Sequence, residues 1–132
     1  MNPELTIQQV TEITEVSTHT LRYYERIGLI LNVGRAPNGH RRYNENDIEW
    51  ITFLKQLKVT RMPLAQMKKF AKLRKKGIST SKQRREMLEV HRKTVVQQIQ
   101  MLNDCLAMID QKIDKHRINE LTLNPKGELH EQ

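Results

Sequence analysis

A heptad repeat in the C-terminal half most strongly limits how this chain can fold. No glycine or proline occurs from Ser81 to His116, so nothing in that segment interrupts a helix. Apolar residues recur there at intervals of four and three, namely Val95, Ile99, Leu102, Leu106, Ile109 and Ile113. The repeat predicts one long helix with a narrow apolar seam. Because one helix cannot bury its own seam, we expect a homodimer, with Leu88 also in its interface.

Two short helices are predicted near the N-terminus. Thr6 can cap the first, whose apolar face is formed by Ile7, Val10 and Ile13. Ser17 can cap a second helix that begins at about Thr18 and ends at Gly28. Residues 14–16 are then the only connection. Two short helices on a tight turn form a helix-turn-helix, in which the second helix is the candidate reader of DNA.

The pattern changes after this second helix. Pro37, Asn38 and Gly39 form a turn between two short stretches, which predicts a β-hairpin, or wing. Asn44 can cap a third helix, and Asp47 is favourable in its first turn. The apolar face of this helix consists of Ile48, Ile51, Leu54 and Leu57, and Trp50 and Phe53 widen it.

A fourth helix is expected between Pro63, in its first turn, and Gly77, which ends it. We expect its buried residues to be Leu64, Met67, Phe70, Ala71 and Leu73. Its outward residues are Lys68, Lys69, Lys72, Lys75 and Lys76. The lysine run is interpreted as partly a solvated face and partly a phosphate-binding surface, with Lys68 as the DNA-binding candidate.

The second helix carries one polar face. His19, Arg22, Tyr23 and Arg26 fall within about a quarter-turn arc at 100° per residue, whereas Leu21, Tyr24 and Ile27 lie on the other side. Arginine pairs with phosphate or guanine edges, and tyrosine and threonine hydroxyls donate to phosphate. Thr18 and His19 lie where free backbone N–H groups favour an anion. Tyr24 is expected in the core.

Charge agrees with a DNA-binding N-terminal part. The net charge is +8; residues 1–78 carry 14 Lys and Arg against 7 Asp and Glu (+7), and residues 79–132 carry 9 against 8 (+1). Polyanions are therefore the first partners to consider. Membrane binding is not expected, because the basic residues belong to several short helices and no 18 apolar residues run together. We expect a soluble cytoplasmic protein.

Catalytic and metal chemistry are not expected. No carboxylate pair, nucleophile with a base, or glycine-rich phosphate loop stands at a useful spacing. The single cysteine, Cys105, excludes an internal disulfide framework and a zinc site built from paired cysteines. Cys105, beside the seam, is interpreted as a packing residue, as are His91 and His116. We therefore predict no metal site and no cofactor.

Residues 5–77 resemble the MerR family of bacterial transcription regulators. The resemblance is carried by LTIQQVTEITEVSTHTLRYYERIGLI and by RAPNGHRRYNENDIEWITFLKQL. It implies a mainly α fold: a winged helix-turn-helix DNA-binding domain (1–77), a dimerisation helix that forms an antiparallel coiled coil (78–116) and a C-terminal tail (117–132). Members bind pseudo-palindromic promoter DNA, bend and untwist it, and thereby realign the elements that RNA polymerase contacts.

The resemblance also implies site residues. Thr18, Arg22 and Tyr23 would contact bases and phosphates, and the wing would contribute Asn38, Arg41, Arg42 and Tyr43. His40 stands where the family usually has tyrosine, and Arg61 where many members have glycine. The full set of expected DNA-binding residues is Thr18, His19, Arg22, Tyr23, Arg26, Asn38, His40, Arg41, Arg42, Tyr43 and Lys68.

A sensing mechanism is not identified by the residues. Metal-sensing members carry cysteines near both ends of the dimer helix, which this chain lacks, and Gln56 stands at the cysteine position of the aldehyde- and nitrosative-stress-responsive branch. A small-molecule effector of unknown identity could still bind between the dimer helix and the DNA-binding domain. The alternative function is a winged-helix architectural or recombination accessory protein that binds DNA without sensing a signal.

Overall fold

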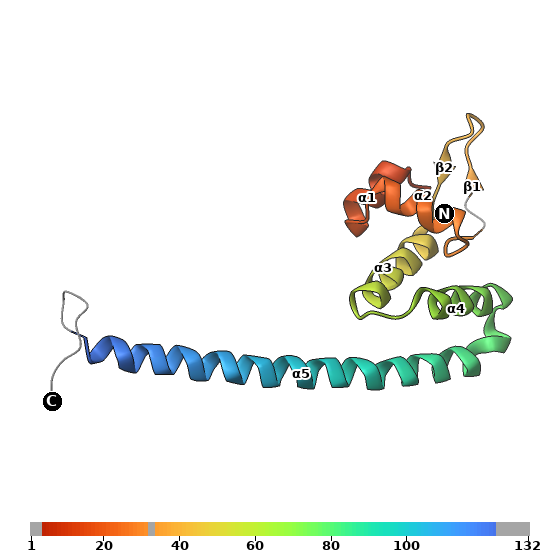
Figure 1. Cartoon of the computed structure of the whole chain (residues 1–132). Coiled ribbons are helices and arrows are strands. Elements are labelled where there is room, and N and C mark those ends of the chain that lie inside the picture. Colours follow the sequence, from red (N-terminus) through yellow and green to blue (C-terminus); the bar gives the residue numbers. More distant parts are fainter. Residues whose placement is uncertain (1–3, 32–33, 124–132) are drawn as a thin grey trace. The chain divides into compact units, whose positions relative to one another are not determined.

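The computed structural model describes residues 4–31 and 34–123. Two short helices come first, α1 (Ile7–Thr14) and α2 (Thr18–Arg26), followed by a hairpin of β1 (Gly34–Arg35) and β2 (Arg41–Arg42). Helices α3 (Glu45–Val59) and α4 (Leu64–Lys76), the 3₁₀ turn η1 (Ile78–Thr80) and the long helix α5 (Ser81–Leu121) complete the described chain (Figure 1). The predicted fold class is confirmed: a mainly helical chain with a two-stranded wing and a long C-terminal helix.

The three predicted helix caps are confirmed. Thr6 and Gln9 form a capping box, in which the Thr6 hydroxyl accepts from the Gln9 amide at 3.2 Å and the Gln9 side chain accepts from the Thr6 amide at 2.9 Å. Ser17 Oγ accepts from the Thr20 amide at 3.1 Å. Asn44 and Asp47 form a second capping box, with both distances at 2.9 Å. These bonds fix where α1, α2 and α3 begin.

One hydrophobic core joins the first four helices. Its buried residues come from the four helices and from the segments that connect them, and the largest that are fully buried are Tyr43, Leu21, Leu29, Ile51, Leu54 and Val10. Trp50 and Phe70 stack with ring centroids 5.8 Å apart and an interplanar angle of 10°. The indole N–H of Trp50 donates to the carbonyl of Leu29 at 2.7 Å, which ties α3 to the segment after α2.

The core differs from prediction at three apolar residues, of which Leu73 is half-buried and lies outside the core cluster. Ile13 is exposed, and its neighbour Thr14 is buried in its place. The Thr14 hydroxyl donates to the carbonyl of Val10 at 2.8 Å, which satisfies the buried oxygen. Leu64, expected in the core, is exposed because α4 begins there, with Pro63 at the N-cap position. Met67, Phe70 and Ala71 are buried as predicted.

The chain divides into two compact units, and the boundary between them along the sequence lies between His91 and Arg92. The first unit includes the beginning of α5, where Met87 and Leu88 pack against the core. Leu88 is half-buried against its own chain's core, and its place in the dimer interface stays a prediction. His91 Nε2 lies 2.7 Å from the Thr60 hydroxyl, which connects α5 to the end of α3.

The second unit consists, in its described part, mainly of the rest of α5. This helix continues past His116 to Leu121, so the predicted tail begins as helix. Residues 117–121 contain no helix breaker, and the first proline beyond them is Pro125. The apolar seam of α5 is exposed, with 44–64% of the surface of Ile99, Leu102, Leu106, Ile109 and Ile113 open. No helix in the described ranges is long and apolar enough to cross a membrane.

Candidate nucleic-acid interface

The polar face of α2 is open, and the opposite face is buried. His19, Arg22, Tyr23 and Arg26 are exposed, whereas Leu21 and Tyr24 belong to the core. The Arg26 guanidinium lies over the Tyr23 ring, 5.5 Å from its centroid, so two of the predicted contact residues form one surface pair. Burial raises the pKa of Tyr24, and the neighbouring Tyr23 raises it further. The adjacent tyrosines therefore have different surroundings, as predicted.

The wing folds over a tight turn. Gly39 has φ of 84°, a conformation that glycine adopts without strain. Its amide donates to the carbonyl of Ala36 at 2.8 Å, and the Asn38 side chain accepts from the His40 amide at 3.1 Å. This bond orients Asn38 within the turn, so its side-chain oxygen already has a partner.

A groove of about 630 Å³ lies between α1, α2 and the wing. Arg22 of α2 faces it, together with five consecutive wing residues, 38–42. The structure therefore brings together Arg22, Asn38, His40, Arg41 and Arg42 from the predicted DNA-binding set. The groove is not lined by the other predicted residues, which are Thr18, His19, Tyr23, Arg26, Tyr43 and Lys68. Lys68 is half-buried on α4.

The groove also contains residues that the sequence did not indicate. Its remaining lining is the beginning of α1, at Thr6, Ile7 and Gln8. They come next to the wing because Leu5 and Tyr43 form a bridge, with Leu5 N donating to Tyr43 O at 2.7 Å and Tyr43 N donating to Leu5 O at 2.8 Å. The pairing of Leu5 with Tyr43 joins residues far apart in the sequence, so no local pattern indicates it. The Thr6 cap did indicate where α1 begins.

One acidic side chain lies among these arginines. Glu25 of α2 accepts a hydrogen bond from Arg35 Nη2 of β1 at 3.0 Å, and its other oxygen accepts from Arg41 Nε of β2. The Glu25 and Arg41 side chains are mostly buried, and Arg35 is about half exposed. Within the described parts of the chain, Arg22 and Arg42 pair with no carboxylate. These two guanidinium groups remain available to an anion.

Tyr43 does not fit its predicted role as a DNA contact. Its side chain is fully buried, and no hydrogen-bond partner for its hydroxyl exists among the described residues. Burial raises the pKa of this hydroxyl, and the nearby Glu25 raises it further. The physical reason is strand alternation: Arg42 and Tyr43 are consecutive in an extended segment, so their side chains point to opposite faces. Tyr43 holds the wing on the core.

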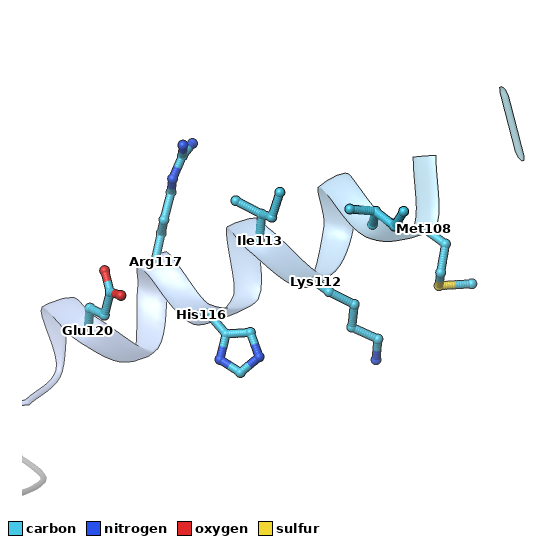
Figure 2. Close-up of a pocket in the computed structure, with 7 residues that line it drawn as sticks. Met108, Lys112, Ile113, His116, Arg117 and Glu120 are labelled. Atoms are coloured by element: carbon cyan, nitrogen blue, oxygen red, sulfur yellow. The ribbon is translucent and has the colours of Figure 1, made fainter. Parts of the chain in front are cut away.

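A second open surface lies on the C-terminal part of α5. Figure 2 shows Ile113 and Arg117 on one side of the helix and Lys112 and His116 on the other. All residues lining this region of about 440 Å³ belong to α5, so it is an uncovered helix face and not an enclosed cavity. Across the described ranges, no three His, Cys, Asp or Glu side chains cluster to hold a metal ion. Cys105 is a free, exposed thiol.

Comparisons with known proteins agree with this architecture. Residues 5–74 match the family model described as MerR HTH family regulatory protein. An HTH-type transcriptional regulator of Haemophilus influenzae is 35% identical over 108 residues, which are 82% of this chain and 80% of the relative.

Solved structures support the same assignment. HiNmlR, a MerR family regulator lacking the sensor domain and bound to promoter DNA, matches with a TM-score of 0.82 at 32% identity, over 90% of this chain and 94% of that chain. A MerR family regulator from Bacillus thuringiensis matches with a TM-score of 0.78 at 31% identity, over 86% and 99%. From the family model and these relatives, the chain belongs to the MerR family of helix-turn-helix regulatory proteins.

Proposed function

We propose that this protein is a homodimeric transcription regulator that binds promoter DNA through α2 and the wing and distorts it to control transcription. Membership of the MerR family supports the regulatory role. The similar protein HiNmlR is bound to promoter DNA in its crystal structure. For this chain, the binding site, the dimer and the distortion are our inferences.

The observation that carries the proposal is the groove in which Arg22 of α2 meets the wing. A helix that reads bases and a hairpin that grips the adjacent phosphates need basic groups side by side. Arg22, Arg42 and His40 line this one groove. Arg22 and Arg42 have no acidic partner in the described residues. Thr18, His19, Tyr23 and Arg26 would extend the contact along α2, with Lys68 as a further phosphate contact.

The exposed seam of α5 supports a homodimer. Five apolar side chains at heptad spacing are about half open to water in a single chain. Covering them with an antiparallel second copy would bury this surface and place two winged domains on one DNA duplex. Two-fold symmetry of the protein then predicts a pseudo-palindromic binding site.

We infer the distortion of the promoter because a dimer that holds one duplex at two points is able to bend and untwist the DNA between them. Smooth bending of a site by 40–90° costs about 1–6 kcal/mol, so binding would favour deformable sequences between the half-sites. RNA polymerase at the promoter is the partner that would benefit, because realigned promoter elements present the geometry it recognises. We place this activity in the cytoplasm. A small-molecule effector, whose chemistry no residue pattern indicates, would modulate it.

The function is tested by selection of DNA followed by transcription. The purified full chain selects duplexes from a random library, and the enriched sequence is placed in a promoter with a long spacer. We expect a two-fold symmetric site, a bend measured by gel mobility of circularly permuted fragments, and a changed transcript level with RNA polymerase. Bending without any change in transcript would favour an architectural DNA-binding protein, and no enriched sequence would refute specific binding.

A further inference from the structure

We propose that Glu25 is a positioning residue for DNA binding: with Arg35 and Arg41 it forms an ion-pair clamp that fixes the wing on the recognition helix α2. The inference rests on the proposed function, because it concerns how the same surface is held for DNA. It assigns different roles to neighbouring wing arginines, with Arg41 acting inside the protein and Arg42 contacting DNA.

The geometry of the clamp is specific. Glu25 Oε1 lies 3.0 Å from Arg35 Nη2, and Oε2 accepts from Arg41 Nε. Arg35 and Arg41 are paired residues on the two strands, so a single carboxylate holds both strands of the hairpin. Each carboxylate oxygen has its own arginine, and charge-assisted hydrogen bonds of this kind are stronger than neutral ones.

The wing needs such an attachment because it is very small. Its strands are two residues each, and an isolated two-stranded hairpin is at best marginally stable in water. Beyond the clamp, the wing is held at its base by the Leu5–Tyr43 bridge and by the buried Tyr43 ring. The base is therefore fixed by packing, whereas the direction of the two strands relative to α2 depends on Glu25.

Burial separates the clamp from a surface ion pair. Glu25 and Arg41 expose 22% and 25% of their side chains, whereas the surface pair Arg85–Glu89 on α5 exposes 58% and 56%. A partly desolvated pair interacts more strongly than an exposed one, and removing one member leaves the other unpaired. Arg41 thus has a partner that any phosphate would have to displace, while Arg42 has no acidic partner in the described chain.

The clamp makes a prediction opposite in sign to simple electrostatics. Removing an acidic charge from a DNA-binding surface ordinarily strengthens binding and steepens its salt dependence. If Glu25 positions the wing, Glu25→Gln instead weakens binding to the selected duplex by roughly tenfold. Its affinity for a random duplex of equal length stays the same or rises, so the specificity ratio falls.

The experiment measures affinity by fluorescence anisotropy across a salt series, using the duplex that the wild-type chain selects from a random library. Arg41→Ala is expected to weaken binding with the salt slope unchanged, and the double variant Glu25→Gln/Arg41→Ala is expected to be no weaker than either single one. The matched control Arg42→Ala should lower the slope by about one, and it should weaken binding less in the Glu25→Gln background than in the wild-type chain, because both changes act through the same wing.

A DNA-free measurement separates this inference from the proposed function. Hydrogen exchange of the Ala36 and Gly39 amides should be faster in Glu25→Gln and in Arg35→Ala, which changes the more exposed of the two clamp arginines. The Trp50 indole and the α3 amides should keep wild-type protection in both variants. Unchanged exchange in the wing, tighter binding by Glu25→Gln, or a lower salt slope in Arg41→Ala would each overturn the clamp. Failure of the wild-type chain to select any duplex would instead count against the proposed function, with the exchange result still deciding the clamp.

Discussion

The dimer seam can be tested by placing charge on α5 at Leu102 and Ile109. Both side chains lie on the same face, seven residues apart, and they expose 64% and 55% of their surface in the single chain. We expect Leu102→Asp/Ile109→Asp to convert the dimer to a monomer. The variant should also bind the selected DNA poorly. Two monomers would have to bind the two half-sites independently, without the high effective concentration that a dimer provides for the second half-site.

The size of the effect follows from the exposed surface. Fully burying a leucine or isoleucine contributes about 1.5–3 kcal/mol, and roughly half of each side chain is already covered by its own helix. The four changed side chains of a dimer therefore lose about 3–6 kcal/mol of apolar burial, or a factor of roughly 10²–10⁴ in the dissociation constant. Four carboxylates in the seam add a desolvation penalty of about several kcal/mol.

Sedimentation velocity at micromolar concentration is the direct assay. The matched control is Gln97→Asp/Gln111→Asp, which adds the same charges to exposed positions of α5 on the side away from the seam. The control should remain a dimer with wild-type helicity. A seam variant that stays dimeric would refute the reasoning, and dissociation of both variants would show that charge, and not seam packing, breaks the dimer.

The remaining predictions concern the DNA-binding unit. Arg22→Ala should weaken binding to the selected duplex by about 1–3 kcal/mol at fixed salt, and unchanged affinity would argue against α2 as the reader. Lys68→Ala/Lys72→Ala should reduce the salt slope, and a wild-type slope would show that this lysine face does not contact phosphate. Tyr43→Phe removes a buried hydroxyl that has no partner among the described residues. Its free energy of unfolding should be equal or up to about 1 kcal/mol higher, with DNA affinity unchanged, whereas lost affinity would restore Tyr43 as a contact. Burial raises the pKa of Tyr24 and Tyr43 above the unfolded value near 10. The stability that these two hydroxyls contribute should therefore be constant below about pH 10 and be lost above it, so stability should fall less steeply above about pH 10 in Tyr24→Phe/Tyr43→Phe, as followed by chemical denaturation.

Local signals explain what could be predicted from the sequence. Thr6, Ser17 and Asn44 are short polar residues placed before apolar periodic segments, and capping needs only a bond to an amide three residues later. The wing turn is similarly local, because Gly39 supplies its positive φ. The starts of α1, α2 and α3 and the position of the hairpin could all be located for this reason.

Residues whose environment is set by distant segments were not predictable in the same way. Ile13 and Thr14 share the last turn of α1, and helical spacing favoured the apolar Ile13 as the buried residue. The core instead covers Thr14, whose hydroxyl is satisfied by its bond to the carbonyl of Val10. Leu88 fits the heptad, and the heptad pattern did not indicate that it also packs against the first unit's core. In both positions the burial of the side chain depends on the neighbouring elements. The periodicity of one helix carries no information about those elements.

Glu25 shows the same limit at the candidate site. In the sequence it is an acidic residue after Tyr24, and charge alone suggests that it opposes DNA binding. Its partners, Arg35 and Arg41, are ten and sixteen residues away, and they reach it only because the hairpin folds back onto α2. Counting basic residues therefore overstates the charge available to DNA on the wing. Of its arginines, Arg42 remains the one without a carboxylate partner in the described chain, and the comparison of Arg41→Ala with Arg42→Ala measures this difference directly.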